Sequence, residues 1–256
     1  MTVPMPRSRS SPRSASRPTP PPARRRASPR AAAHLEGTLA GHPASDSTSD
    51  ALLDAAEFLF AAHPYDAVSL RAVTTRARAN LAAVSYHFGS KQALYLAVLL
   101  RRLRPLNERR ILALDAALRA HAPAPVPLRA LITAFLAPVA ELVDASGPSP
   151  HPFVRFMARF LQDPPPFSEG IAREEFASLG RHFGPHLLAH LPHLTPATLV
   201  WRARFIFGAA NTTFARAAPF ERRLAELGAA ADGPTQLAQL TAFIEAGLIA
   251  PDPAKP

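Results

Sequence analysis

The chain has 256 residues, of which 48% are apolar, and a formal net charge of +10. This length allows one large domain or two small ones with a sizeable core. The absence of cysteine excludes disulfides and thiolate metal sites. The sequence contains no run of about 18 apolar residues, so we expect no membrane span, and no apolar segment follows the basic N-terminus as a secretory signal requires.

The positive charge is concentrated in an N-terminal tail, residues 1–46, that is rich in Pro, Ser, Arg and Ala. Eight of the +10 charges are arginines within residues 1–30, which contain no acid, so +2 remains for residues 31–256. Such a segment buries too little apolar surface to offset its ordering entropy, so we expect disorder. It is interpreted as a solvated extension, as a misassigned start, or as an arm that strengthens nonspecific nucleic-acid binding through counterion release.

The first helix is predicted to begin near Ser47. Ser47 and Asp50 resemble a capping box. Leucine, alanine and phenylalanine residues then recur at the spacing of one helix face, until Pro64 ends the helix. Ser69 is a suitable N-cap for a second, short helix.

A third short helix follows after a tight turn. Asn80 is a suitable N-cap for it, and Gly89 can adopt the positive φ that ends a helix. Ser90 then caps a long fourth helix, which we expect to bend at Pro105. Residues 47–92 therefore have the layout of a helix-turn-helix domain.

The rest of the chain alternates helical patterns with proline-rich breaks. Helices are predicted over 128–145, 152–162, 167–191 (continuous or broken at Pro185), 195–217 and 234–249. Residues 251–256 are expected to be disordered. Because no alternating strand pattern bounded by turn residues is present, the sequence predicts an all-α fold, a three-helix domain followed by a larger helical domain.

The third helix is the element expected to enter the major groove of DNA. Val84 and Phe88 are four residues apart and should face inward, onto the first two helices. Ala82 and Ala83 are small enough to let the helix approach base edges and contact a thymine methyl group, and Ser85 can donate or accept.

Phosphate contacts are expected around this helix. Tyr86 and His87 have the reach for phosphate oxygens, while Ser69 and Lys91 stand at two further helix starts, where backbone N–H groups attract phosphate. The alternative is a small helical hairpin with a surface Tyr–His pair.

Residues 49–100 resemble the N-terminal domain of the TetR family of bacterial transcriptional regulators. The matching segments are DALLDAAEFLF, SLRAVTTRARAN and LAAVSYHFGSKQALYLAVL, of which YHFGSK is the most specific. The resemblance implies DNA contacts at Ser69, Asn80, Leu81, Ala82, Ser85, Tyr86, His87 and Lys91, and the packing argument above adds Ala83. The family commonly has glycine where this chain has Arg78, and an aromatic residue where it has Ser85. A left-handed conformation at Arg78 should cost roughly 1 kcal/mol.

The resemblance also implies that residues 93–250 form an effector-binding and dimerisation domain. A dimer is independently expected, because one short helix reads too few base pairs and two copies must lie about 34 Å apart to reach successive major-groove faces. Segments 195–217 and 234–249 are the candidate dimerisation helices, with packing inside one chain as the alternative.

Apolar residues that could form the walls of an effector pocket recur on two helices. They are Phe153, Phe156, Met157, Phe160, Trp201 and Phe205. The same spacing also fits a plain core. Arg155, Arg159, Arg202 and Arg204 could bind an acidic head group or lie on a solvated face. A loose similarity of the C-terminal part to fatty-acid-linked family members implies a small lipophilic effector, such as an acyl or other lipophilic acid.

Metal binding and catalysis are not expected. His182, His186, His190 and His193 have helical spacing, but Pro185 disturbs that helix and no carboxylate shares their face, so they are interpreted as solvated or partly buried. The sequence has no Gly-rich phosphate loop, nucleophile elbow, cysteine nucleophile or paired-carboxylate site. We therefore expect no metal, no cofactor and no enzyme.

The function predicted is a homodimeric, ligand-responsive repressor that binds a double-stranded DNA operator in the bacterial cytoplasm, associated with the nucleoid. The alternative is a nonspecific architectural protein that binds DNA through its basic tail. Deletion of residues 1–46 separates the two, because only the nonspecific protein should lose most of its affinity.

Overall fold

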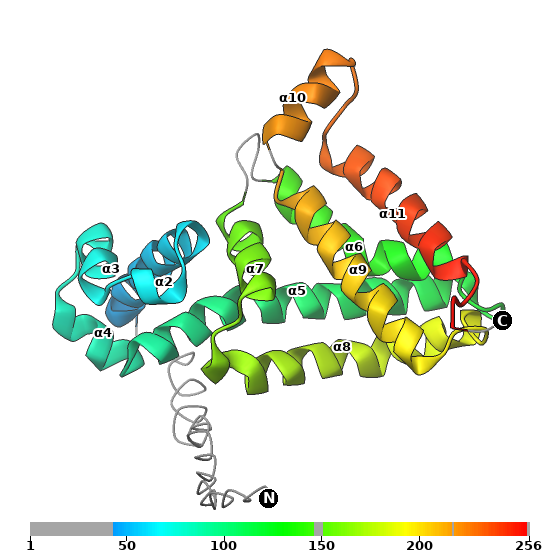
Figure 1. The fold of residues 1–256 in the computed structure, drawn as a ribbon. Coiled ribbons are helices and arrows are strands. Elements are labelled where there is room, and N and C mark those ends of the chain that lie inside the picture. The colour runs from blue at the N-terminus through cyan, green and yellow to red at the C-terminus, as the bar shows by residue number, and fades with distance from the viewer. Residues whose placement is uncertain (1–42, 146–150, 217, 255–256) are drawn as a thin grey trace, which may run out of the picture.

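The computed structural model describes residues 43–145, 151–216 and 218–254. Within these ranges the chain forms ten α-helices and two short 3-10 helices, with no strand (Figure 1). The all-α prediction is therefore confirmed. None of the described helices is apolar over a length that would cross a bilayer. The predicted disorder of the N-terminal tail concerns residues that lie, except for 43–46, outside the described ranges.

Three helices form the N-terminal domain: α2 (Pro43–Ala62), α3 (Leu70–Ala77) and α4 (Leu81–Phe88). A 3-10 turn, η1 (Tyr65–Ala67), joins the first two. The predicted start near Ser47 is wrong, because α2 extends back to Pro43. Proline is favoured in a first helical turn, since the N–H it lacks has no intrahelical partner there.

Short side chains define the ends of these helices as predicted. The Ser69 hydroxyl and the Asn80 side-chain oxygen each accept the N–H three residues on, at 3.1 and 2.8 Å. Ser90 caps the next helix in the same way, at 3.1 Å. Gly89 ends α4 with a φ of 73°. These bonds satisfy helix N–H groups that would otherwise have no partner.

Seven helices follow. They are α5 (Lys91–His121), α6 (Leu128–Asp144), α7 (Pro152–Gln162), α8 (Glu169–His190), α9 (Pro196–Phe214), α10 (Ala218–Glu226) and α11 (Gly233–Ile249). A second 3-10 turn, η2 (Pro166–Ser168), precedes α8. Both α5 and α8 continue through an internal proline. The sequence analysis did not predict α10, although Phe220 and Leu224 are four residues apart, as on one face of a helix.

Helix α5 connects the two parts of the molecule. It leaves the N-terminal domain, passes α7, and continues beside α6 and α8 to the far end, where α9 and α11 pack on α6 (Figure 1). The sequence predicts disorder over residues 251–256, but residues 251–254, which the structure describes, are held there by side-chain contacts. Asp252 accepts the backbone N–H of Thr195 and the hydroxyl of Thr198, both at 2.6 Å, and Arg202 donates to three carbonyl oxygens at the chain end.

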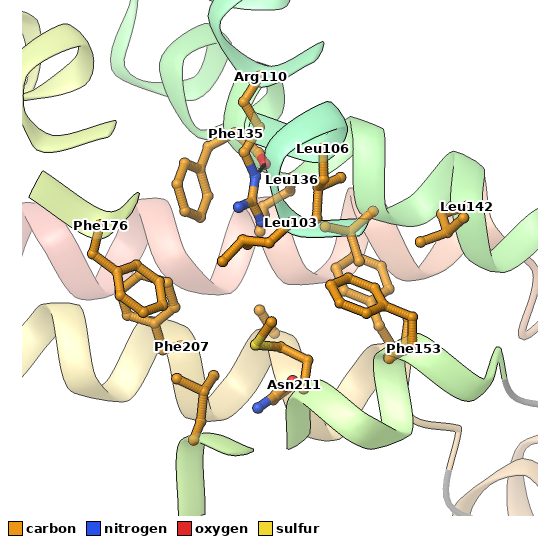
Figure 2. A pocket seen from close by; sticks show the side chains of 16 residues that line it. Leu103, Leu106, Arg110, Phe135, Leu136, Leu142, Phe153, Phe176, Phe207 and Asn211 are labelled. Carbon is orange, nitrogen blue, oxygen red and sulfur yellow. Dashed lines mark hydrogen bonds between the residues drawn. The ribbon is translucent and has the colours of Figure 1, made fainter. Parts of the chain in front are cut away.

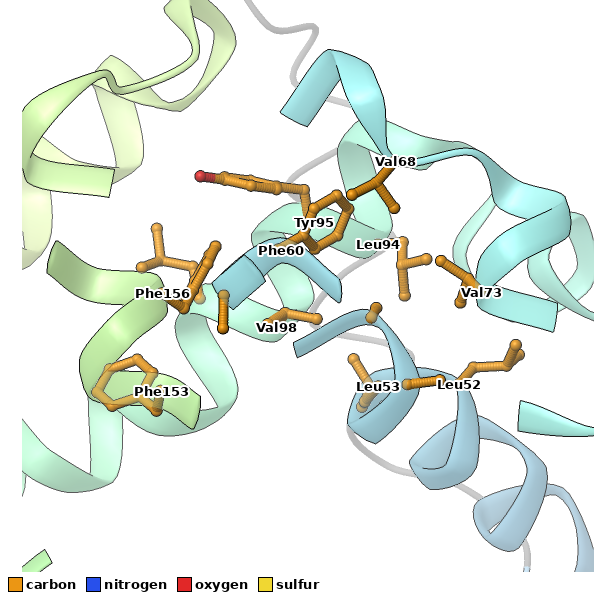
Figure 3. Packing of buried hydrophobic residues seen from close by; sticks show 14 of the residues in the cluster. Leu52, Leu53, Phe60, Val68, Val73, Leu94, Tyr95, Val98, Phe153 and Phe156 are labelled. Carbon is orange, nitrogen blue, oxygen red and sulfur yellow. The ribbon is translucent and has the colours of Figure 1, made fainter. Parts of the chain in front are cut away.

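The core of the N-terminal domain extends into α7. Phe60 of α2 and Tyr95 of α5 are in edge contact, with ring centroids 4.8 Å apart, and Tyr95 meets Phe156 of α7 at 5.1 Å (Figure 3). Phe153 and Phe160 belong to the same buried cluster. Because packed aromatic rings resist sliding, the N-terminal domain and α7 should move together.

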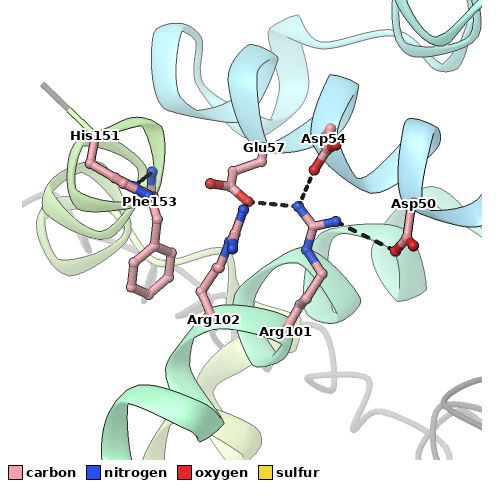
Figure 4. A network of polar contacts seen from close by, with 7 residues as sticks. All are labelled: Asp50, Asp54, Glu57, Arg101, Arg102, His151 and Phe153. Atoms are coloured by element: carbon pink, nitrogen blue, oxygen red, sulfur yellow. Dashed lines mark hydrogen bonds and ion pairs between the residues drawn. The ribbon is translucent and has the colours of Figure 1, made fainter. Parts of the chain in front are cut away.

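A polar network fixes α2 against α5 (Figure 4). The buried Glu57 accepts from Arg101 at 2.9 Å and from Arg102 at 3.1 Å. Arg101 also donates to Asp54 at 2.6 Å and lies 3.8 Å from Asp50. Charge-assisted bonds to a buried carboxylate are directional, so this network orients the N-terminal domain on α5.

Candidate DNA-binding surface and effector cavity

Several of the side chains that helix α4 exposes are small, and two buried residues anchor its other side. Val84 and Phe88 are buried in the core of the N-terminal domain, as predicted. Tyr86 is 77% exposed, and Leu81 is also exposed. The remaining predicted contacts on α4 are exposed at Ala82 and Ser85 and half-buried at Ala83 and His87. Apart from Tyr86 and Leu81, the exposed side chains of α4 are small, so the helix can approach base edges in the major groove.

The predicted phosphate contacts surround this helix at one end of the molecule. Ser69 is exposed at the start of α3, and Lys91 is the first residue of α5 (Figure 1). The Lys91 ammonium lies 4.1 Å from the centroid of the Tyr65 ring. Burial lowers the Lys91 pKa, and the nearby Asp66 carboxylate partly opposes this. Tyr86 and His87 are in edge contact, with ring centroids 4.9 Å apart.

The turn between α3 and α4 contains a strained residue. Arg78 has φ 54° and ψ 37°, a left-handed conformation, at the C-cap of α3. Its N–H donates to the carbonyl of Thr75 and closes the helix. This is the position where the sequence departs from the glycine common in similar proteins, and the side chain is exposed.

A cavity lies at the centre of the larger domain. It is lined by residues from α5, α6, α7, α8 and α9, among them Leu103, Phe135, Met157, Phe176 and Phe207 (Figure 2). The cavity is narrow, with a volume of about 60 Å³. The walls are apolar except for two side chains, Arg110 of α5 and Asn211 of α9.

A second, wider cavity lies next to the first. It is wholly lined by apolar residues of α6, α8, α9 and α11 and has a volume of about 270 Å³. The two cavities share the wall residues Phe135, Leu136, Phe176 and Phe207. The Phe207 ring is in edge contact with Phe135 and with Phe176, at centroid distances of 6.0 and 5.3 Å.

The residues predicted for an effector pocket are divided among three environments. Phe153 and Met157 line the first cavity. Phe156 and Phe160 lie in the core shared with the N-terminal domain and line neither cavity. Trp201 and Phe205 lie on the outer face of α9, 57% and 61% exposed, with stacked rings 6.0 Å apart. Helical spacing finds an apolar stripe, but it cannot say whether the stripe meets a core, a cavity or solvent.

The arginines considered for an acidic head group do not line these two cavities either. Arg202 donates to the Leu248 carbonyl near the end of α11, and Arg159 donates to the Ala62 carbonyl at 3.2 Å. Sequence reasoning missed Arg110, although a signal was present. Leu103, Leu106, Arg110 and Leu114 follow one another at helical spacing, so a charged residue interrupts the apolar face of α5.

Two histidines of α8 have backbone carbonyl partners. His190 bonds the Val126 carbonyl at 2.7 Å, and His182 bonds the Ser178 carbonyl one turn earlier at 2.9 Å. Over the ranges that the structure describes, no group of three His, Asp or Glu side chains is placed to hold a metal ion.

The fold and the surface of α4 define a helix-turn-helix protein with a separate, cavity-containing helical domain. Two family models match the chain: one described as bacterial regulatory proteins of the tetR family over residues 52–98, and one described as the tetracyclin repressor-like C-terminal domain over residues 133–247. The chain belongs to the TetR family of bacterial transcriptional regulators.

One solved structure with a TM-score above 0.5 supports the fold. NalD, the secondary repressor of the MexAB-OprM multidrug efflux pump in Pseudomonas aeruginosa, is 22% identical, with 80% of this chain and 98% of that chain covered and a TM-score of 0.51. A TetR-like regulator from Rhodococcus sp. RHA1 is 18% identical, covers 78% of this chain and 95% of its own, and has a TM-score of 0.49. No curated protein sequence matches the chain.

Proposed function

We propose that this protein is a homodimeric transcriptional repressor that a small lipophilic effector releases from its operator. It binds double-stranded DNA through α4 of each subunit and acts in the bacterial cytoplasm. The single observation that best supports this function is the position of α7, which contributes side chains both to the wall of the cavity and to the core of the DNA-binding domain.

On the operator, Ala82 and Ala83 approach base edges and Ser85 forms a polar contact there. Phosphate oxygens are bound by the side chains and helix starts around them, at Ser69, Asn80, Tyr86, His87 and Lys91, with Leu81 packed against the backbone. Exposure of α4 and the side-chain caps on three helix starts support this assignment.

The effector acts through α7. A molecule in the first cavity presses on Phe153 and Met157, and the same helix carries Phe156 into contact with Tyr95 of the DNA-binding domain. Displacement of α7 therefore tilts the DNA-binding domain. In a dimer this changes the distance between the two α4 helices, and the effector favours the state whose spacing no longer fits DNA.

The dimer forms through the outer faces of α9 and α11. Val200, Trp201, Phe205 and Phe243 are each more than half exposed in the single chain. A second copy that packs there as a four-helix bundle removes this apolar surface from water. We expect Trp201→Glu combined with Phe205→Glu to give monomers in analytical ultracentrifugation, while Leu112→Glu, at an equally exposed position on α5, stays dimeric.

The DNA-binding assignment is tested with Tyr86→Ala combined with Lys91→Ala. We expect operator affinity at moderate salt to fall by about 10- to 100-fold. The slope of log affinity against log salt concentration should become shallower by about one, because one phosphate contact by a charged side chain is lost. Arg119→Ala, an exposed charge at the far end of α5, is the matched control and should change neither. Deletion of residues 1–46 should preserve protection of a pseudo-palindromic site. Unchanged affinity of the double variant, or loss of site protection on the deletion, would contradict the proposal.

A further inference from the structure

The first cavity contains a positive charge that no carboxylate of the described residues neutralises. Arg110 is only 7% exposed and its guanidinium lies among the apolar side chains that line the cavity (Figure 2). Burial lowers the pKa of Arg110 to about 10, so the side chain is still charged at neutral pH. Among the described residues, no carboxylate forms an ion pair with it.

The neighbouring arginines of α5 are all paired. Arg101 and Arg102 bind Glu57, Arg104 binds Glu175 at 3.1 Å, and Arg109 binds Glu141. Arg104 and Arg109 lie on more exposed faces of the helix, where pairing adds little stability, whereas Arg101 and Arg102 share the buried carboxylate of Glu57. The buried Arg110 is the one for which an acid partner would matter most, because an isolated charge away from water is costly.

Some of the N–H donors of Arg110 bond to other protein groups, and the rest have no acceptor among the described residues. Its Nε–H donates to the Phe135 carbonyl at 3.0 Å, and Nη1 donates to Asn107 Oδ1 at 3.1 Å. The guanidinium carbon also lies 4.2 Å from the centroid of the Phe135 ring. A guanidinium has five N–H donors, so three remain without an acceptor in the described part of the chain. These contacts fix the plane of the group and leave its outer edge available.

We infer that Arg110 is the anion-recognising residue of the effector site and that the effector is an amphipathic monocarboxylate. The carboxylate accepts from the free edge of the guanidinium, and the apolar part of the molecule lies along Phe135 and Phe207, the walls that both cavities share. This inference rests on the proposed role of the first cavity as the effector site.

Two features of the site favour a carboxylate on an apolar body over a neutral lipophilic molecule. The planar guanidinium can form two parallel hydrogen bonds to a carboxylate, and the negative charge of the anion offsets the buried positive charge of Arg110. Asn211 is the only other polar side chain on the walls, so a ligand with several polar groups would lose hydrogen bonds on entry. A single head group and an apolar remainder fit this wall composition.

The test is calorimetric titration of the full-length protein without DNA, with octanoate and 1-octanol as probes. We expect octanoate to bind at least about ten times more tightly than 1-octanol, since only the anion pairs with the guanidinium. Affinity should rise about fourfold per methylene from hexanoate to decanoate as apolar surface is buried. Equal affinity for acid and alcohol, or no binding of any of these acids, would overturn the inference.

Variants locate the effect at one side chain. Arg110→Met should weaken octanoate binding about 10- to 100-fold and change 1-octanol binding by less than about threefold. Arg109→Met, at the next residue and exposed, is the matched control and should bind octanoate like the wild type. If circular dichroism shows that Arg110→Met does not fold, Arg110→Lys replaces it, with a loss of about tenfold expected for octanoate alone. Wild-type affinity for octanoate in a folded Arg110 variant would refute the assignment.

Operator release is measured separately, so the two proposals fail in different ways. Octanoate that binds through Arg110 without releasing DNA would contradict the regulatory mechanism and leave the anion site in place. Operator release by neutral lipophilic molecules that also bind Arg110→Met normally would support regulation and contradict the anion site.

Discussion

The strained turn between α3 and α4 allows a quantitative test of the structure. Arg78 has φ 54° and ψ 37°, and its side chain is exposed. A left-handed conformation costs a residue with a Cβ atom about 1–2 kcal/mol, whereas glycine adopts it without that cost. Glycine also gives the unfolded chain more freedom, which removes about 0.4–1 kcal/mol of the gain. We therefore expect Arg78→Gly to raise the free energy of unfolding by about 0.5–1 kcal/mol.

The assay compares three proteins by urea unfolding at one protein concentration, because the stability of a dimer depends on concentration. Arg78→Ala removes the charge and keeps the Cβ atom, so it should unfold like the wild type. For a chain of this size the gain in Arg78→Gly corresponds to a rise in melting temperature of about 1–4 °C. The reasoning is refuted if Arg78→Gly is no more stable than Arg78→Ala. Arg78→Gly and Arg78→Ala both lack the arginine charge. If the two variants bind the operator equally but more weakly than the wild type, the loss is due to that charge.

Two further predictions concern the contacts that hold the N-terminal domain. Glu57→Gln keeps one acceptor but removes the charge shared by Arg101 and Arg102, and should cost about 2–3 kcal/mol in urea unfolding. Asp54→Asn, at an exposed site, should cost less than about 1 kcal/mol, and equal losses would show that burial is not the cause. His151 caps α7 by accepting the Phe153 N–H through Nδ1, at 3.0 Å, which requires a neutral ring.

The pKa of His151 is lowered mainly by burial, with Glu57 opposing and Arg102 adding to the shift. A folded-state pKa below the unfolded value means that the unfolded chain binds the proton more readily. The contribution of His151 is thus fully present above the ordinary histidine pKa of about 6.5 and is lost as the pH falls through the folded-state value. His151→Asn keeps an acceptor that does not titrate, so its unfolding free energy should fall less between pH 7.5 and 5.5 than that of the wild type. Parallel pH profiles would contradict this role.

The parts of the structure that the sequence predicts are those determined by neighbours within one helical turn. Ser69, Asn80 and Ser90 cap their helices because each bonds an N–H only three residues away, and Gly89 ends α4 because glycine readily adopts a positive φ. The inward positions of Val84 and Phe88 follow from the same short-range geometry. The resemblance to TetR-family segments is concentrated in this stretch. Few residue types fit there, because the helix must expose small side chains on the face expected to approach DNA.

The tertiary structure decided what each apolar stripe meets. Phe153 and Phe156 are three residues apart on α7, yet one lines a cavity and both belong to the core of the other domain. The cavity joins side chains from five helices, and nothing in the local sequence of α5 distinguishes Arg110 from its paired neighbours except its place on the apolar face. Periodicity specifies which side of a helix avoids water, but only the packing of distant helices determines whether that side meets another side chain, an empty space or a second molecule.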